Sequence, residues 1–212
     1  MAKLATVQIA IGSRIGLLES DLQKLYLAEK RSSAEVARIL KCSEHKVNYW
    51  LLKYNITKRS IAEAVYVHYN PKGDPFHLKE IKTLADAKLF GFGLGLYWGE
   101  GSKKSKGMVK LGNTDPKLIK KFIQFLIQIC GVKTTKMRFS LQIFSDMHTR
   151  KVMQFWFKEL REFDILPQQF FKTTITPHRG IGTYREKTKY GVLTVHVCNS
   201  KLKALIDSLL PR

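Results

Sequence analysis

The sequence predicts an α+β protein in which a small all-α domain precedes a larger domain of helices and strands. Helical periodicity dominates residues 20–60, and alternating strand and helix patterns fill residues 108–210. Between them, HYNPKGDPF (68–76) holds two prolines and a glycine, a composition typical of a loop. We therefore expect domains at 1–60 and 84–212, joined by a linker at 61–83.

The charge of the chain indicates the class of its partner. The 212 residues include 37 basic and 17 acidic side chains, a net charge of +20. Residues 1–83 carry a net charge of +6 and residues 84–212 one of +14, so no single basic tail explains the total. This imbalance favours a polyanion such as nucleic acid as partner. The alternative is a basic protein whose charge serves only solubility.

The cysteines and the apolar segments predict where the protein resides. Cys42, Cys130 and Cys198 are too far apart for a zinc motif or a disulfide framework, which favours a reducing compartment. The first 16 residues make a poor signal peptide, and the longest apolar run, 89–99, is shorter than the roughly 20 residues that span a bilayer. We expect an intracellular protein, cytoplasmic or nucleoid-associated, with no membrane partner.

The first domain has the spacing of a helix-turn-helix. Leu22, Leu25 and Tyr26 mark one amphipathic helix, Ser33 is the expected N-cap of a short second helix, and Ser43 that of a third. Ala37 suits a close crossing of the second and third helices.

In a helix-turn-helix the third helix enters the major groove. The residues expected to contact DNA are therefore His45, Lys46, Asn48, Tyr49 and Lys53, with Lys58 and Arg59 suited to phosphates. Any three-helix bundle could show the same spacing with these side chains merely solvated.

A glycine-rich apolar segment, LFGFGLGLYWGEG (89–101), opens the second domain. It fits neither a Walker loop nor a dinucleotide fingerprint. Gly91, Gly95 and Gly99 recur every four residues, so they share one helix face, which would let a second helix approach closely. We expect the large residues Leu89, Phe92 and Leu96 to pack into the core. The alternative is a packing seam within one domain, with Glu100 an ordinary surface acid.

The remaining segments predict a sheet with one basic face. Strand patterns occupy 108–113, 136–144, 170–176 and 190–198, and helical patterns occupy 115–130, 148–163 and 199–210. The outward strand positions hold hydrogen-bond donors and no acid, which suits phosphates and base edges, although a solvated face is the alternative. These positions are Lys110, Arg138, Ser140, Gln142, Lys172, Thr174, Thr176, Thr194 and His196.

The segment GLGLYWGEG (93–101) resembles the nine-residue signature of the LAGLIDADG homing endonucleases. Gly95, Gly99 and Gly101 take its third, seventh and ninth positions, and Glu100 the catalytic eighth. Gly93, Leu94 and Trp98 depart from it. The resemblance implies that 84–212 forms an α/β core whose curved antiparallel sheet straddles DNA. It also implies that 177–189 is a basic hairpin tip carrying Arg179 and Arg185.

The resemblance further implies a site-specific double-stranded DNA endonuclease. Because the chain holds one motif, it would act as a homodimer on a pseudo-palindromic site, with Gly91, Gly95 and Gly99 at the interface. Glu100, with Gly99, would hold Mg²⁺, or Mn²⁺ in its place. Lys189 is the expected basic catalytic partner, with Lys187 and Lys172 as alternatives, and Lys103 and Lys104 would contact phosphates.

Two other functions fit the same sequence. A non-cleaving transcriptional regulator would need the same basic surfaces but no acid at position 100. An RNA-binding intron maturase is the other alternative, because this scaffold also takes that role.

Overall fold

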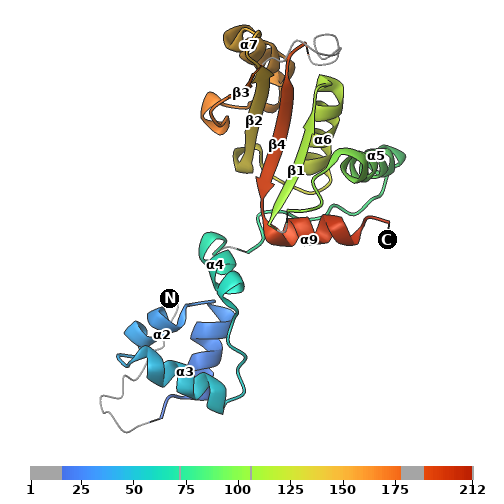
Figure 1. The fold of residues 1–212 in the computed structure, drawn as a ribbon. Coiled ribbons are helices and arrows are strands. Elements are labelled where there is room, and N and C mark those ends of the chain that lie inside the picture. Colours follow the sequence, from blue (N-terminus) through green and yellow to red (C-terminus); the bar gives the residue numbers. More distant parts are fainter. Residues whose placement is uncertain (1–15, 72, 106, 178–188, 212) are drawn as a thin grey trace, which may run out of the picture. The chain divides into compact units, whose positions relative to one another are not determined.

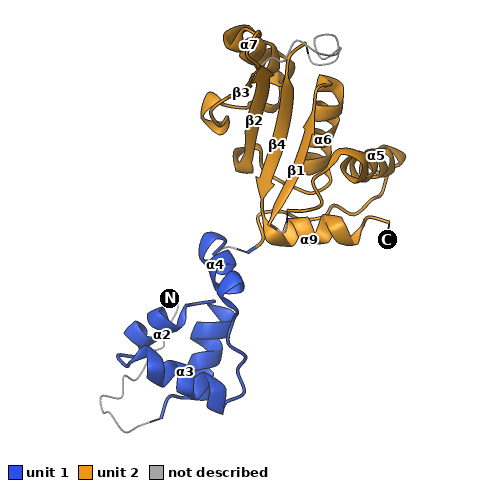
Figure 2. Cartoon of the chain, viewed as in Figure 1, with its two compact units in different colours: residues 1–73 blue, residues 74–212 orange. Residues whose placement is uncertain are grey.

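The computed structural model describes residues 16–71, 73–105, 107–177 and 189–211. The chain divides into two compact units, residues 1–73 and 74–212 (Figure 2). In its described part, unit 1 contains helices and no strands, whereas unit 2 combines helices with a four-stranded sheet (Figure 1). The predicted α+β class is confirmed.

Unit 1 is built around three short helical segments. α1 (Glu19–Leu22) continues into a π-helical segment at Gln23–Ala28, followed by α2 (Ser33–Ile39) and α3 (Glu44–Lys53). Ala37 is 5% exposed, as expected at a close crossing. The apolar faces of the three segments form one core, made of Leu22, Tyr26, Val36, Ala37, Val47, Leu51 and Ile56.

The start of α2 corrects one prediction. Ser32, and not Ser33, is the N-cap: its hydroxyl accepts from the backbone N–H of Glu35 (3.2 Å), whose carboxylate accepts from the N–H of Ser32 (2.8 Å). Either serine suits an N-cap, but the glutamate three residues later completes a capping box only with Ser32. The predicted cap of α3 is confirmed, because the Ser43 hydroxyl accepts from the N–H of Lys46 (3.2 Å).

The predicted linker contains one helix and a segment that pairs with unit 2. It contains α4 (Ile61–Tyr69), whose N-cap Ser60 accepts from the N–H of Glu63 (3.2 Å). Further on, the N–H groups of His77 and Lys79 donate to the carbonyls of Cys130 and Ile129 (3.0 and 2.8 Å). The stretch from residue 74 therefore belongs to unit 2.

The sheet of unit 2 is mixed, which corrects the prediction of an antiparallel one. Its order is β1 (Met108–Asn113), β4 (Val192–Cys198), β2 (Met137–Phe144), β3 (Thr174–Thr176). β4 pairs antiparallel with β1 and β2, but β3 pairs parallel with β2. α7 lies between β2 and β3 in sequence, and such a helical crossover returns the chain to the same end of the sheet. β3 is also shorter than the predicted 170–176.

One face of the sheet forms the core of unit 2. Met137, Phe139, Leu141 and Ile143 alternate inward along β2, as predicted. They share one apolar cluster with residues of four helices. These helices are α5 (Leu84–Glu100), α6 (Pro116–Gln128), α7 (Thr149–Glu159) and α9 (Ser200–Ser208).

Candidate nucleic-acid interface

The buried side of α5 is set by one glycine and one tyrosine. A Cβ added to Gly93 would lie 2.2 Å from Cγ of Phe125 in α6, so only glycine fits there. One turn later, the ring of Tyr97 stacks on Phe122, with centroids 6.0 Å apart and planes at 5°. α5 therefore approaches α6 closely, and both contacts lie within unit 2.

The other side of α5 is open. Gly91, Gly95 and Gly99 are exposed, and a Cβ added to any of them would meet no atom within 4 Å. Phe92 is 45% exposed and Trp98 56% exposed, so the prediction that Phe92 packs into the core is wrong. The buried side is centred on Gly93 and Tyr97, four residues apart, and Phe92 lies at its margin.

The residues after α5 hold its C-terminal end against the sheet. A Cβ on Gly101 would lie 2.4 Å from the carbonyl oxygen of Tyr97, which excludes any other residue at that turn. Gly101 pairs with Leu111 at the free edge of β1, and the N–H of Ser102 donates to the carbonyl of Lys110 (2.9 Å). Glu100 is exposed and immediately precedes this pairing. Glu100 therefore lies where the end of α5 meets the edge of the sheet.

Tyr97 holds this turn through a hydrogen bond from inside the core. Its hydroxyl donates to the carbonyl of Ser102 (3.1 Å), and the side chain is fully buried. Burial, together with the charge of Asp207, raises the pKa of Tyr97 to about 12. The phenol therefore remains a neutral donor at physiological pH, and the backbone that carries Glu100 is held from both sides.

The lysines after Glu100 differ in what they contact. Nζ of Lys103 donates to the carbonyl of Trp98, one of the last carbonyls of α5, where a cation is favoured. Lys104 is exposed.

Glu100 does not belong to a cluster of metal-binding side chains among the described residues. In the part of the chain that the structure describes, no three or more His, Cys, Asp or Glu side chains gather to hold a metal ion. A hard cation here would draw on the Glu100 carboxylate and nearby backbone oxygens, such as that of Gly99. Its remaining ligands would come from water, a phosphate or a second copy.

The outer face of the sheet brings most of the predicted donors into one grid. The register aligns Lys110, His196 and Arg138 across three strands, and Thr194 and Ser140 in the next row. None of the four strands contains an acidic residue. Lys110, Gln142 and Thr174 are exposed, and so is Lys172, which precedes β3.

Several of these side chains are oriented by hydrogen bonds. Nε2 of Gln142 donates to the hydroxyl of Thr176 (3.0 Å). Nη1 of Arg138 donates to the carbonyls of Thr135 and Met137 (2.9 and 2.8 Å), which holds its guanidinium against the start of β2. The sheet thus presents polar groups in set positions.

His196 differs from its predicted role as an outward donor. It lies on the outer face but is 8% exposed, because the ring of Phe171 stands edge-on to it (centroids 5.6 Å, 81°). Its Nε2 lies 2.8 Å from the Ser140 hydroxyl, and its Nδ1 lies 3.3 Å from Sδ of Met108. Burial, and then the charge of Lys110, lowers the pKa of His196. The imidazole is therefore neutral at pH 7.

In unit 1, α3 exposes only some of the predicted DNA contacts. His45, Tyr49 and Lys53 are exposed, and Nζ of Lys53 lies 4.4 Å from the centre of the Trp50 ring. Lys46 and Asn48 are half-buried, and Oδ1 of Asn48 is buried without a hydrogen-bond partner among the described residues. Fewer side chains of α3 are exposed than the spacing of the sequence predicted.

Arg59 is used inside unit 1, whereas the sequence favoured a phosphate contact. Its guanidinium donates to the carbonyls of Lys30 (3.1 Å) and Arg31 and lies 4.1 Å from the centre of the Tyr26 ring. These partners are about thirty residues away in sequence, so no local sequence pattern could predict these contacts of Arg59. Arg59 ties the chain before α4 to the loop before α2.

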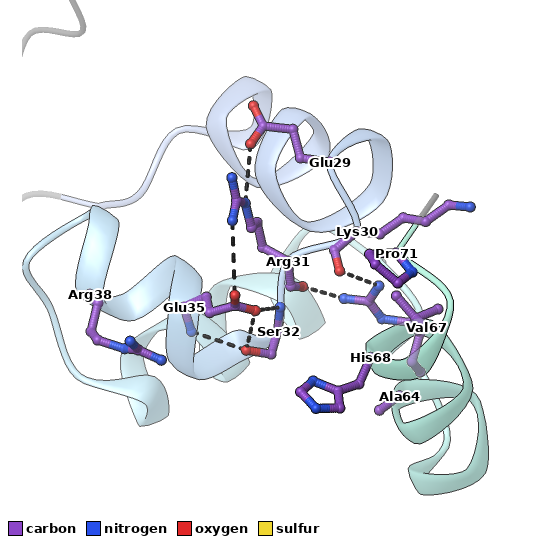
Figure 3. A pocket seen from close by; sticks show the side chains of 11 residues that line it. Glu29, Lys30, Arg31, Ser32, Glu35, Arg38, Ala64, Val67, His68 and Pro71 are labelled. Carbon is purple, nitrogen blue, oxygen red and sulfur yellow. Dashed lines mark hydrogen bonds and ion pairs between the residues drawn. The ribbon is translucent and has the colours of Figure 1, made fainter. Parts of the chain in front are cut away.

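The same loop lines a cavity of about 370 Å³ that the sequence did not predict (Figure 3). Its walls come from the loop before α2, from α2 and from α4. Arg31 pairs with Glu29 and Glu35 (3.4 and 3.9 Å), and Arg59 donates to the backbone as described. The two acids that line the cavity are thus paired with Arg31, and the lining as a whole holds more basic than acidic side chains.

The remaining predicted residues lie apart or outside the described residues. Lys189 is exposed, and its Nζ lies 5.6 Å from the centre of the Tyr190 ring. It precedes β4 and lies six positions before Val195, the β4 residue that pairs with Leu111; the register therefore does not bring it to Glu100. Lys187, Arg179, Arg185 and nearly all of the predicted hairpin tip lie outside the described residues.

Comparison with protein-family models, with curated proteins and with solved structures finds no match for this chain. Among the residues that the structure describes, no helix is long and apolar enough to cross a membrane.

Proposed function

We propose that this protein is a site-specific, Mg²⁺-dependent endonuclease of the LAGLIDADG type that cuts double-stranded DNA as a homodimer. The observation that carries the proposal is the construction of α5. Its glycine face is open to a second helix, and its last residue, Glu100, stands exposed at the edge of a sheet whose strands hold no acid. A packed dimer of such helices would bring two carboxylates together on a donor-rich surface.

Different residues of the chain would bind the metal ion and the DNA. The Glu100 carboxylate, with the backbone oxygen of Gly99, would hold the cation, which when bound activates water and stabilises the leaving oxygen. Lys110, Lys172 and the oriented amide of Gln142 would contact phosphates and base edges. His45, Tyr49 and Lys53 of α3 would extend the contact, giving a longer pseudo-palindromic site.

A non-cleaving DNA-binding regulator is the second candidate. The observation that favours it is that α3 and the outer face of the sheet provide binding groups that do not involve Glu100. Both functions predict selective DNA binding, and only the endonuclease requires the carboxylate.

Glu100→Gln separates the two candidates. The wild type should cut a site selected from a randomised DNA library when Mg²⁺ is added. Loss of the ligand should slow cutting by on the order of 1,000-fold, because the metal contributes several kcal/mol to catalysis. DNA affinity should be equal or higher, since one negative charge near phosphate is removed. Glu162→Gln, at another exposed acid of unit 2, is the matched control and should cut normally.

The contrary outcomes are clear. Undiminished cutting by Glu100→Gln would remove Glu100 from the site, and tight selective binding by every variant without cutting would establish the regulator.

A further inference from the structure

The outer face of the sheet contains one apolar patch inside its grid of donors. Phe171 is 50% exposed and stands edge-on to His196, whose Nδ1 lies 3.3 Å from Sδ of Met108. The surrounding residues are polar: Lys110 and Arg138 lie in the same row as His196, with Ser140 and Thr194 in the next row. Phe171 therefore places apolar surface, which is unfavourable in water, within a row of hydrogen-bond donors.

Phe171 is held firmly in place. Its N–H donates to the carbonyl of Phe139 in β2 (2.8 Å), and the preceding Phe170 forms a parallel bridge with Phe139. The Phe170 ring stacks on Phe139 in the core, with centroids 5.1 Å apart. Because successive residues of an extended chain point to opposite faces, Phe171 points to the outer face.

The patch carries no charge at its centre. Both ring nitrogens of His196 are engaged, one by Ser140 and one by Met108. Burial keeps the imidazole neutral, so the cationic groups stand only at the rim of the patch. The outer face of the sheet therefore has a rigid apolar patch at Phe171, surrounded by hydrogen-bond donors.

The major groove offers one apolar group to such a spot. Its base edges carry donors and acceptors that differ between base pairs, and the C5-methyl group of thymine is its only hydrocarbon feature. Phenylalanine is among the side chains that contact this methyl.

We propose that Phe171 is a specificity-determining residue that packs against a thymine C5-methyl group in each half-site. The inference rests on the proposed binding of DNA and would hold equally for an endonuclease or a regulator. It accounts for both the exposure of Phe171 and its rigid support.

A methyl-deletion scan tests this directly. The full chain selects its site from randomised duplexes in EDTA, and each thymine of that site is then replaced by deoxyuridine, which lacks only the methyl group. One position in each half-site should lose affinity about fourfold, the effect of one buried methyl group, and about 16-fold when both half-sites are changed. In Phe171→Ala the loss at that position should vanish, whereas Phe171→Leu should keep most of it.

Ile175→Ala is the matched control. Ile175 is 57% exposed but pairs in β3 with the inward-facing Ile143, so its substitution should leave the deoxyuridine profile unchanged. If Phe171 only covered His196, its substitution would alter stability without altering the profile.

The outcomes are distinguishable. Selective binding with no sensitivity to deoxyuridine, or sensitivity that persists at the same position in Phe171→Ala, overturns the role of Phe171 alone. Absence of any selected DNA overturns the proposed function together with this inference.

Discussion

The two sides of α5 both contain glycine, but the surroundings of these glycines are opposite. On one side, Phe125 occupies the space next to Gly93, and an added Cβ would lie 2.2 Å from its ring. On the other, Gly91, Gly95 and Gly99 face open space. A glycine that meets a neighbour is explained by the fold of its own chain. One that meets nothing weakens its helix without any packing reason inside its own chain, and it is on such glycines that the proposed dimer rests.

The largest expected effect tests the open side. Gly95→Leu should convert the dimer that we propose into monomers, raising its dissociation constant about 100-fold or more, because the two new side chains would keep the helices apart. Sedimentation velocity over a range of concentrations measures the change. Gly107→Leu is the matched control, since its added Cβ also meets nothing within 4 Å but lies outside α5. A dimer unaffected by Gly95→Leu would show that the open glycines are not the interface.

The next effect contrasts the two sides by adding a single methyl group to each. Gly93→Ala should lower the free energy of unfolding by about 1–3 kcal/mol, because Phe125 is fully buried and has little room to move. Gly95→Ala should raise that of the monomeric chain by up to about 1 kcal/mol, because alanine favours a helix and meets no obstacle within its own chain. Urea unfolding followed by circular dichroism gives both values. Equal effects of one sign would end the distinction between the two sides.

The smallest effect concerns the sheet, where His196 is a packed group on an otherwise open face. Its pKa is lowered in the folded state, so the unfolded chain binds the extra proton first as pH falls. Stability should therefore be complete above about pH 6.5 and decline below it, by at most about 1.4 kcal/mol per pH unit from this group.

Urea titrations between pH 5 and 7.5 measure this decline. His196→Gln should flatten the profile, and His148→Gln, at an exposed histidine, should not. A profile unchanged by His196→Gln would mean that His196 is not the group responsible.

The candidate site could be predicted in part, and the pattern of success has a physical basis. The small-residue face of α5 and the acid-free strands follow from periodicity, which depends only on local backbone geometry. The burial of His196 and the engagement of Arg59 do not, because Phe171, Lys30 and Arg31 reach them from distant parts of the chain. Phe171 itself carried no recognisable sequence signal, since its neighbour Phe170 looks the same and packs inward.

The sequence by itself determined the two-part organisation, the α+β class, the positions of the main helices and strands, and the basic character of both parts. These depend on hydrophobic periodicity, capping residues and composition, all of which act locally. Only the tertiary structure decided that β3 runs parallel to β2, that Phe92 is exposed, and which glycines of α5 have a neighbour packed against them. A pattern determines which residues share a face, but what that face meets depends on elements brought together from elsewhere in the chain.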